Sequence, residues 1–581
     1  MRIRTKIICT MGPAVTQLDK LLALIESGMS VARLNFSHGT HEEHARTIAL
    51  IKEARERAGR PVAIMLDTKG PEIRVGPLEA PIVSKEGALL RLVPMGGVLK
   101  EGEVPINPPS VLKSLKKGAP VLFDDGLVVT RVVEVLADAV LVEGVNGGEI
   151  RSRKGINVPG LDLALPMVTE QDEADIRFGC QQGIEMIAAS FVCYPEHIEK
   201  IKRILAEEGA SDVIVAAKIE SQKGVENFEA ILQAADAIMI ARGDLGVEVP
   251  LSQVPGLQKR MIRECYEAAK PSIVATQMLE SMTHNMRPTR AEASDVAGAI
   301  YESASAVMLS GETAVGRYPV ETVQTMRSIV EQAESEFNYQ LFYSSIPIRA
   351  SQDVPTSIAL AAVKTAISAS ASALFVITAK GLTARLTSRL RPKMPIVTLT
   401  TSKRIYHQLA FYWGVIPVYV DKVDSFQEGF EVLSDYALKA KLVGWGDLVV
   451  TTAGVPFGRS GTTNSMVVKS IGNVLLRGEK GYGKRVTGVV EILSDTERGV
   501  EAKGKILVIP RVTSETLALI GGAVGVVLKG LKRDPEAEAL LVGEAERLGI
   551  PVLIALDAVY SGLREGESAT LDPENAIILG E

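Results

Sequence analysis

One stretch of the sequence, residues 213–250, constrains the fold more than any other. It contains two apolar runs, VIVAAKI and AIMIA, separated by a segment with helical periodicity. Each run ends abruptly in charge, the first at Lys218 and Glu220 and the second at Arg242 and Asp244. This pattern is typical of a βαβ unit in a parallel sheet, where helices cover the strands and polar residues at the carboxyl ends face a ligand.

The charges of this unit suggest a type of ligand. Two carboxylates, a lysine and an arginine suit a divalent metal ion that holds an anionic substrate. Gly243, between Arg242 and Asp244, lets an anion approach backbone N–H groups where a helix begins. For this stretch alone, the charges could instead form surface ion pairs at loop ends. The positions of the other polar residues in the chain distinguish these two interpretations.

The same rhythm recurs through residues 1–340. Eight apolar runs are predicted to be strands, each followed by a helical pattern: residues 4–10, 31–36, 62–66, 186–189, 213–219, 237–241, 272–275 and 306–309. Residues 75–165 interrupt the alternation, with short β-like runs between Gly, Pro and Asn turns, which predicts a small all-β insert. Eight βα units predict a (β/α)8 TIM barrel, formed by residues 1–74 and 166–340, with the insert after its third strand.

A barrel of this kind brings the carboxyl ends of its strands to one face. Polar residues lie at or just past these ends: Arg33, Asn35, Ser37, Asp67, Thr68, Ser190, Lys218, Glu220, Arg242, Asp244, Thr276, Ser310 and Glu312. Unrelated surface ion pairs would not be distributed in this way. We therefore expect one site that draws residues from the whole barrel.

Two further units follow the barrel. Residues 341–475 are predicted to form an α/β domain, with strands at 374–378, 396–400, 415–420, 448–453 and 466–471. Its turn TAKGLTAR, residues 378–385, and its loop GVPFGRSGTTN, residues 454–464, have the form of an anion site, and each is also compatible with a tight turn. Residues 485–581 are predicted as a small α/β unit that ends in a hairpin.

Composition and charge exclude some classes. A chain of 581 residues is too long for one core, and its net charge of −6 disfavours nucleic acid or an anionic membrane as the main partner. No apolar run reaches the ~18 residues of a membrane span, and a predicted strand so near Met1 leaves no room for a signal sequence, so we expect a cytoplasmic protein. The four cysteines show no paired metal spacing and are expected to be reduced and buried.

Six motifs carry a resemblance to a known family. The segments MLDTKGPEIR, KIES, IMIARGDLGVE, ATQMLESM, RPTRAEASDVA and MLSGETA, in this order, resemble those of pyruvate kinase over about the first 475 residues. The insert at 75–165 lies where that family has its mobile lid. The resemblance implies transfer of a phosphoryl group from phosphoenolpyruvate to ADP, giving pyruvate and ATP, which is the last step of glycolysis.

The resemblance also implies roles for residues of the barrel. Glu220 and Asp244 would hold Mg²⁺ (or Mn²⁺), Arg33 would bind the transferred phosphate, and Lys218 would stabilise its charge in the transition state. The substrate carboxylate would lie on the backbone of Gly243 and Asp244 beside Thr276. The remaining implied members of the catalytic and substrate-binding set are Ser190, Ser310 and Glu312, with Thr276 and a water chain protonating the enolate.

Further sites follow from the same resemblance. The K⁺ ligands would be Asn35, Ser37, Asp67 and Thr68, and Glu72 agrees with K⁺ dependence because K⁺-independent members carry lysine there. The nucleotide would meet Asn35, His38, Arg74 and Lys154. An activating sugar phosphate or AMP would bind at Thr378, Lys380, Gly381 and Thr383, and a homotetramer is the family's usual state.

The C-terminal unit, residues 485–581, resembles a bacterial extension similar to the phosphohistidine domain of phosphoenolpyruvate-using enzymes. Its segment contains no histidine, since the last one in the chain is His407. The chemistry of such a domain requires that histidine. We therefore expect a structural or regulatory extension.

Two other functions remain to be weighed. An aldolase or lyase on a related metal-dependent barrel also handles pyruvate enolates, but it has no ADP for the lid and Lys154 to cover. A catalytically inactive sensor that uses only the effector domain is the second alternative. It is disfavoured because Lys218, Glu220, Asp244 and Thr276 are all present, and convergent buried charges are costly without chemistry.

Overall fold

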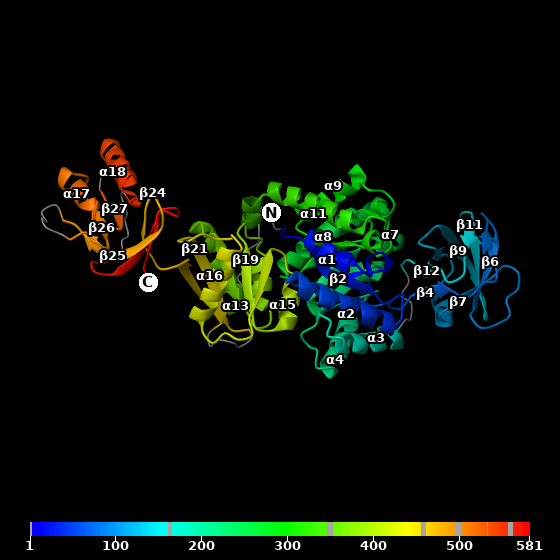
Figure 1. The fold of residues 1–581 in the computed structure, drawn as a ribbon. Helices are drawn as coiled ribbons and strands as arrows, with labels where there is room; N and C mark the ends of the chain where they lie inside the picture. Colours follow the sequence, from blue (N-terminus) through cyan, green and yellow to red (C-terminus); the bar gives the residue numbers. More distant parts are fainter. Residues whose placement is uncertain are drawn as a thin grey trace. The chain divides into compact units, whose positions relative to one another are not determined.

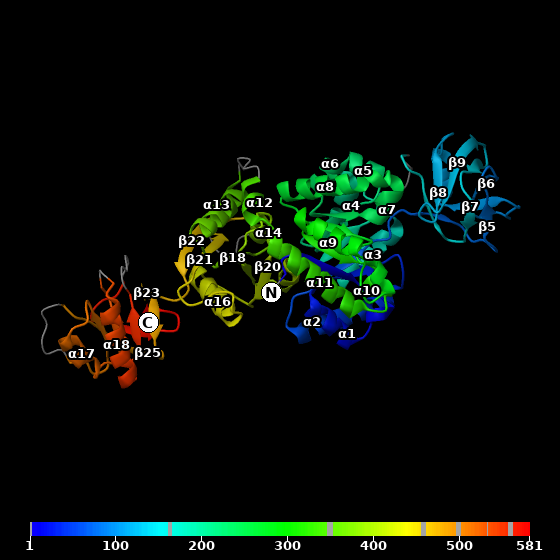
Figure 2. The same cartoon turned by 90° about the horizontal axis from the view of Figure 1, so that it is seen from above.

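The computed structural model describes residues 3–160, 166–345, 353–454, 461–494, 501–530, 533–555 and 562–580. The chain divides into two compact units, one of residues 1–356, 378–393 and 398–422 and the other of residues 357–377, 394–397 and 423–581. We describe each unit by itself (Figures 1 and 2). Most of the predicted loop GVPFGRSGTTN, residues 455–460, lies outside the described residues.

Eight parallel strands close into a barrel in the first unit, as the sequence predicts. In spatial order these are β1, β17, β16, β15, β14, β13, β3 and β2. Their bounds are Lys6–Thr10 (β1), Met29–Asn35 (β2), Ala63–Asp67 (β3), Met186–Ala189 (β13), Ile214–Ile219 (β14), Ala237–Ala241 (β15), Ser272–Ala275 (β16) and Ala306–Leu309 (β17). The predicted TIM barrel is confirmed, and four of the strands have the predicted bounds.

Helices surround this barrel (Figures 1 and 2). They are α1 (Leu18–Ser27), α2 (His41–Ala58), α3 (Glu170–Gln181), α4 (Pro195–Glu207), α5 (Gln222–Glu226), α6 (Phe228–Ala234), α7 (Arg242–Glu248), α8 (Val254–Glu267), α9 (Arg290–Tyr301), α10 (Gly311–Ala314), α11 (Pro319–Glu336) and α12 (Tyr339–Ser345). Short 3₁₀ turns lie at Pro13–Val15, Leu251–Gln253 and Glu280–Thr283. Capping boxes start α2, α3 and α9, each with a threonine that accepts from the backbone N–H three residues later.

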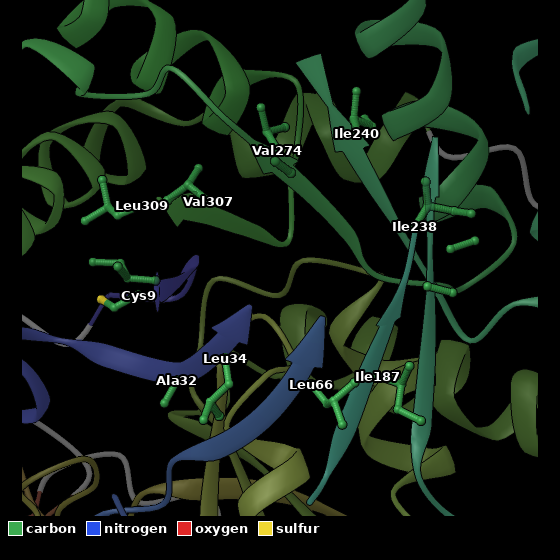
Figure 3. Close-up of a cluster of buried hydrophobic side chains, with 14 of the residues drawn as sticks. Cys9, Ala32, Leu34, Leu66, Ile187, Ile238, Ile240, Val274, Val307 and Leu309 are labelled. Carbon is green, nitrogen blue, oxygen red and sulfur yellow. The ribbon is translucent and has the colours of Figure 1, made fainter. Parts of the chain in front are cut away.

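The strands alternate between two buried environments. Cys9, Leu34, Leu66, Ile187 and Val274 belong to the core cluster that also contains the helices' apolar residues (Figure 3). Their neighbours along each strand point to the opposite side, into the barrel, because strand side chains alternate with a period of two. By this alternation the polar residues at the strand ends extend the inward-facing rows.

The insert after β3 is a small closed barrel of its own. Its order is β10, β6, β7, β4, β12, β8 and β9, with bounds Ile73–Val75 (β4), Leu89–Pro94 (β6), Glu103–Asn107 (β7), Pro120–Phe123 (β8), Val128–Val135 (β9), Val140–Gly144 (β10) and Gly155–Asn157 (β12). A two-stranded ribbon joins β5 (Ile82–Ser84) to β11 (Gly148–Ile150), and a 3₁₀ turn spans Pro109–Ser114. Phe123 and Val142 are fully buried in its separate core, so the predicted all-β insert is confirmed. We call this insert the lid.

A five-stranded sheet follows, in the order β20, β19, β18, β21 and β22. Its strands are Ala373–Ile377 (β18), Ile396–Thr400 (β19), Val415–Tyr419 (β20), Leu448–Gly454 (β21) and Thr463–Ser470 (β22), and its helices are α13 (Val354–Ser368), α14 (Leu382–Ser388), α15 (Lys403–Leu409) and α16 (Phe426–Lys439). Strand β22 pairs antiparallel with β21, whereas β21 pairs parallel with β18. This is the predicted α/β arrangement.

The end of the chain forms a mixed eight-stranded sheet, in the order β23, β30, β29, β25, β26, β27, β28 and β24. The elements are β23 (Val474–Arg477), β24 (Lys480–Tyr482), β25 (Val486–Ile492), β26 (Lys505–Ile509), α17 (Ser514–Ile520), β27 (Gly525–Leu528), α18 (Pro535–Leu548), β28 (Val552–Ile554), β29 (Ser568–Asp572) and β30 (Ile577–Gly580). The predicted hairpin is β29 and β30, which pair antiparallel. Strands β23 and β24 also belong to this sheet, although neither had been predicted from the sequence.

Two smaller expectations can be compared with the structure. Cys9 and Cys265 are buried and reduced as expected, whereas Cys180 and Cys193 are reduced but only half-buried. Among the described helices, none combines the length and the apolar character needed to cross a membrane.

Candidate active site

An array of buried charges lies at the carboxyl ends of β2, β3 and β14. Arg33 Nε lies 2.5 Å from Asp67 Oδ2, and Lys218 Nζ lies 3.0 Å from Asp67 Oδ1. Lys218 Nζ also lies 3.0 Å from Glu220 Oε1 and donates to Ser190 Oγ at 2.7 Å. Five strand ends contribute to this array, since Arg33 also donates to Thr10 Oγ1 on β1 at 2.9 Å.

The charges in this array stabilise one another. Asp67 is fully buried, which alone would raise its pKa, but the cations Arg33 and Lys218 outweigh burial and the pKa is lowered. Burial likewise acts to lower the pKa of Lys218, and Asp67 and Glu220 reverse this and raise it. Lys218 is therefore held as a cation inside the barrel mouth, beside the guanidinium of Arg33.

A pair of carboxylates, Glu220 and Asp244, lies beside this array. Burial raises the pKa of Glu220 to about 7, with Lys218 opposing and Asp244 adding to the rise. Burial also raises the pKa of Asp244, and the carboxylate of Asp125 in the lid adds to this rise. A hydrogen bond with Glu220 opposes it. The backbone N–H of Phe191 donates to Glu220 Oε2 at 2.6 Å and fixes its orientation. The two carboxyl groups therefore lie together in a buried position, next to the ammonium group of Lys218.

The turn after β16 has an unusual backbone. Thr276 and Gln277 have φ of 70° and 54°, a conformation that is rare for a β-branched residue such as threonine. Thr276 Oγ1 accepts from the N–H of Gly243 at 2.8 Å and donates to the carbonyl of Ala275 at 2.6 Å. The strained turn thus presents a hydroxyl to the start of α7, where the sequence predicts a carboxylate-binding backbone.

The side chain of Arg242 holds this turn in place. Its guanidinium pairs with Asp295 at 2.7 Å and donates to the carbonyl of Thr276 at 2.8 Å. The sequence groups Arg242 with the residues aimed at a ligand, and in the structure its guanidinium is engaged by protein groups. Asp295, on α9, had been missed, although it lies in the motif RPTRAEASDVA.

Glu312 braces two loops. Its carboxylate accepts from the N–H of Leu279 at 3.1 Å and from the N–H of Ser310 at 2.6 Å, and it is fully buried. Burial raises its pKa. Both oxygens thus accept from backbone donors, so Glu312 and Ser310 connect the loops after β16 and β17.

The oxygen-rich set predicted to bind K⁺ lies at the ends of β2 and β3. Asn35 is the register partner of Asp67 in the paired strands, and Asn35 Oδ1 accepts from the N–H of Ser37 at 3.1 Å. Thr68 Oγ1 accepts from the N–H of Ser190 at 3.0 Å, and Ser190 Oγ donates to the Thr68 carbonyl at 2.6 Å. The structure therefore places Asn35, Asp67 and Thr68 at neighbouring strand ends next to Lys218.

The residues predicted to meet a nucleotide lie in three places. His38 is exposed just past β2. Arg74, on β4 of the lid, pairs with Glu72 at 2.6 Å, and Lys154 pairs with Asp124 at 2.9 Å with its side chain 44% exposed. Both lid cations thus have a carboxylate partner in this structure, and Glu72 contacts Arg74.

A cleft of about 390 Å³ runs under the lid beside the carboxylate pair. Residues from both sides line it, including Glu72, Asp125 and Asn157 of the lid and Asp244 and Glu248 of α7. Asn157 Nδ2 donates to Glu248 Oε1 at 3.2 Å across the cleft. This hydrogen bond connects the lid to the helix that carries Asp244, and it had not been predicted.

The predicted effector loop follows β18. Gly381 has φ of 81° and its N–H donates to Thr378 Oγ1 at 3.0 Å, so a tight turn leads into α14. Lys380 is exposed, whereas the side chain of Thr383 is buried.

Comparisons with known proteins agree with this geometry. Residues 2–323 match the model of the pyruvate kinase barrel domain, and residues 356–469 match that of the pyruvate kinase alpha/beta domain. The chain belongs to the pyruvate kinase family. It is therefore an enzyme of the pyruvate kinase class.

Individual relatives extend this likeness. The chain is 42% identical to pyruvate kinase of Geobacillus stearothermophilus over 581 residues, 98% of both chains, so the likeness includes the C-terminal unit. It is 47% identical to the enzyme of Chlamydia trachomatis over 424 residues, 72% of this chain and 87% of the relative. A crystal structure of a pyruvate kinase from Cryptosporidium parvum superimposes with a TM-score of 0.78 at 36% identity, over 81% of this chain and 96% of the other.

Proposed function

We propose that this member of the family transfers the phosphoryl group of phosphoenolpyruvate to ADP. Arg33 and Lys218 would be the cations that bind this group during the transfer. The observation that carries the proposal is the buried array in which Asp67 holds both cations at the barrel mouth. Positioned cations accelerate phosphoryl transfer by stabilising charge on the transferred group. In the reaction the bond between phosphorus and the enol oxygen breaks, and a bond to a β-phosphate oxygen of ADP forms.

A divalent cation, Mg²⁺ or Mn²⁺, fits the carboxylate pair. Glu220 and Asp244 offer hard oxygen donors of the kind that Mg²⁺ prefers, and burial raises the pKa of both carboxyl groups although Lys218 opposes the rise. Within the described residues no cluster of three or more His, Cys, Asp or Glu is placed to hold a metal. A two-carboxylate site leaves room for substrate oxygens, and the bound ion would supply charge neutralisation.

The substrate carboxylate would bind at the turn between Thr276 and α7. The N–H of Gly243 donates to the hydroxyl oxygen of Thr276 there, and a substrate carboxylate could accept from the N–H and the hydroxyl in place of this bond. The enolate left after transfer needs a proton on carbon, and the Thr276 hydroxyl with a water chain is the group we assign to that step. Glu312 and Ser310 would position the surrounding loops.

Further parts of the proposal concern ions, nucleotide and regulation. K⁺ would bind Asn35, Ser37, Asp67 and Thr68, and ADP would lie against His38, Arg74 and Lys154. A sugar phosphate or AMP would act at the loop of Thr378, Lys380, Gly381 and Thr383. We further propose a homotetramer, a cytoplasmic location, and a structural or regulatory C-terminal extension, which detectable phosphotransfer to that extension would contradict.

The deciding experiment measures pyruvate formation from phosphoenolpyruvate with Mg²⁺, with and without ADP, in K⁺ buffer and in buffer free of monovalent metal ions. ADP-dependent pyruvate that collapses without K⁺ supports both the kinase and the cation site. Undiminished activity without K⁺ keeps the kinase and removes the cation site. No ADP-dependent product, with sugar phosphates and AMP also tested, would favour a lyase.

A second arm uses Glu72→Lys. If K⁺ acts near this position, a lysine charge should replace it, and the variant should keep activity in buffer without K⁺. The control is Glu149→Gln, which changes an exposed lid carboxylate paired with Arg151 and should leave the K⁺ requirement intact.

A further inference from the structure

A large cavity in the first unit is not used by the proposed reaction. It has a volume of about 900 Å³ and is lined by the C-terminal turn of α8, the loop that leads to β16, part of α6, and α14. Strand β16 begins at Ser272 beside this cavity and ends at Ala275, next to Thr276 of the candidate active site.

Three half-buried cations line the cavity: Lys270, Arg385 and Arg389. Lys270 Nζ donates to the carbonyls of Leu232 and Gln233 at 2.6 and 2.7 Å, and Arg389 donates to the carbonyl of Glu267 at 3.3 Å. Within the described part of the chain, the guanidinium of Arg385 has no hydrogen-bond acceptor and no ion-pair partner. None of the three cations is within ion-pair distance of a described carboxylate.

The carboxylates of the cavity lie at its edge. Glu229, Glu267 and Asp353 are exposed, and Glu264 is paired with Arg260 at 3.6 Å. Asp236, which acts on Lys270 from outside the lining, is itself paired with Lys202 at 2.8 Å. The interior of the cavity is thus cationic and its rim is acidic.

Burial disfavours the charged forms of Lys270 and Arg389. It lowers the pKa of Lys270 to about 8, with Arg385 and Lys202 adding to the effect and Asp236 opposing it. Burial also lowers the pKa of Arg389. A bound anion would stabilise the charged form of these partly buried cations, because it replaces interactions that water would otherwise provide.

The cavity also has an apolar wall. Leu386 of α14 and Leu390, just after this helix, are buried, and Leu382, Leu232 and Tyr266 add partly or fully apolar surface. A ligand that uses the whole cavity therefore combines an anionic group with an apolar body, as most small-molecule sites do.

We propose that this cavity is a binding site for a small organic anion, a phosphate or carboxylate on an apolar body, held by Arg385, Arg389 and Lys270. The cavity shares Leu382 with the loop of Thr378 to Thr383, but its three cations lie outside that loop and outside the barrel mouth. The proposal does not rest on the phosphoryl-transfer reaction, because binding can be measured without turnover.

The test is isothermal titration of the full chain with phenyl phosphate, and with inorganic phosphate for comparison, in buffer without Mg²⁺ or ADP. Phenyl phosphate should bind more tightly than inorganic phosphate, because only the former uses the apolar wall. Arg385→Gln should weaken phenyl phosphate binding at least about tenfold, as expected for the loss of a charge-assisted hydrogen bond. Arg263→Gln, which removes an exposed cation from the same helix α8 outside the cavity, should leave binding unchanged.

Other outcomes would overturn the proposal. Binding that survives in Arg385→Gln, or that is lost instead in Lys380→Gln or Arg33→Gln, would assign the anion to the effector loop or the barrel mouth. An absence of binding to the unaltered chain would also overturn it. The melting temperature of each variant is measured in parallel, and if Arg385→Gln does not fold, Lys270→Gln takes its place with the same expected loss.

Discussion

The backbone N–H of Gly243 donates to the hydroxyl of Thr276 at 2.8 Å, and this bond joins the start of α7 to the turn after β16. One partner is the residue before Asp244, and the other has a φ of 70° that threonine rarely adopts. Strain of this kind persists only where the surroundings impose it. Here Arg242 holds the strained turn, because its guanidinium donates to the Thr276 carbonyl and also pairs with Asp295.

Thr276→Val should test the hydroxyl without changing the backbone preference, since both side chains are β-branched. We expect kcat/KM for phosphoenolpyruvate to fall by about 10- to 100-fold, because a donor and acceptor at the substrate carboxylate is lost. Thr276→Ser, which keeps the hydroxyl, should remain within about fivefold of the unaltered enzyme. Equal activity of the Val and Ser variants in steady-state assays would contradict the role.

Asp295→Asn should loosen the turn without touching the substrate. Because the charged partner of Arg242 is removed, we expect an increase of about three- to tenfold in KM for phosphoenolpyruvate and a smaller change in KM for ADP. Steady-state kinetics with each substrate varied in turn would measure this. A matched control is Asp236→Asn, which removes the partner of Lys202 on the far side of the barrel strands; a similar rise in that control would refute a specific effect.

Lys218→Met removes the cation shared by Asp67, Glu220 and Ser190. We expect kcat to fall by at least about 10³-fold, since charge on the transferred phosphoryl group loses its stabilisation. Removing one partner of a buried pair also destabilises a protein, by about 3–5 kcal/mol in typical cases, so thermal unfolding is recorded beside the kinetics. Lys202→Met, at the half-buried pair with Asp236, should change kcat by less than about twofold; residual activity in Lys218→Met near that of the control would disprove the assignment.

Asn157→Ala cuts the hydrogen bond from the lid to Glu248. Hydrogen bonds to charged groups are worth about 1.5–3 kcal/mol, so we expect KM for ADP to rise by about 10- to 100-fold while the melting temperature is unchanged. Glu149→Gln, an exposed change elsewhere in the lid, is the control. An unchanged KM for ADP would mean that this bond does not help to hold the lid over the nucleotide.

His407 gives a pH dependence of stability. Burial, with Arg55, Lys403 and Lys52 adding, lowers its pKa to about 3 from an ordinary value near 6.5. The folded state therefore resists protonation, so stability is complete above about pH 6.5 and is lost as pH falls from there toward 3. Thermal unfolding between pH 7 and 5 should show a smaller loss for His407→Gln than for the unaltered chain, whereas the exposed His38→Gln should behave like the unaltered chain; identical slopes for all three would rule this out.

The barrel could be predicted in detail because its strands are short, apolar and bounded by polar residues. Met186–Ala189 and Ala306–Leu309 were predicted with the bounds that the structure shows, since helical and strand periods alternate cleanly around them. In contrast, β23 and β24 are only four and three residues long and become strands through partners such as β30 and β28. No local pattern in a stretch so short can predict such distant pairing.

The sequence predicts which residues converge on the site, but it does not predict their hydrogen-bond partners. The position of Lys218 and Asp67 at strand ends predicts that they converge, because a barrel gathers those ends. Tertiary packing sets the loop conformations that bring Arg242 to Asp295 and two backbone N–H groups to Glu312. The left-handed conformation of Thr276 could not be predicted either, because residue type argues against it.

The two ends of the lid are tied together at the barrel. The N–H of Gly70, where the chain leaves, donates to Asp172 Oδ1 at 3.0 Å, and Asp172 belongs to the capping box of α3, where the chain has returned. An insert of about a hundred residues therefore leaves and re-enters the barrel at hydrogen-bonded neighbours, and a change in its length would add little closure entropy. The fold of the barrel therefore does not depend on the length of the insert. In evolution, one lid could be replaced by another at this position without refolding of the barrel.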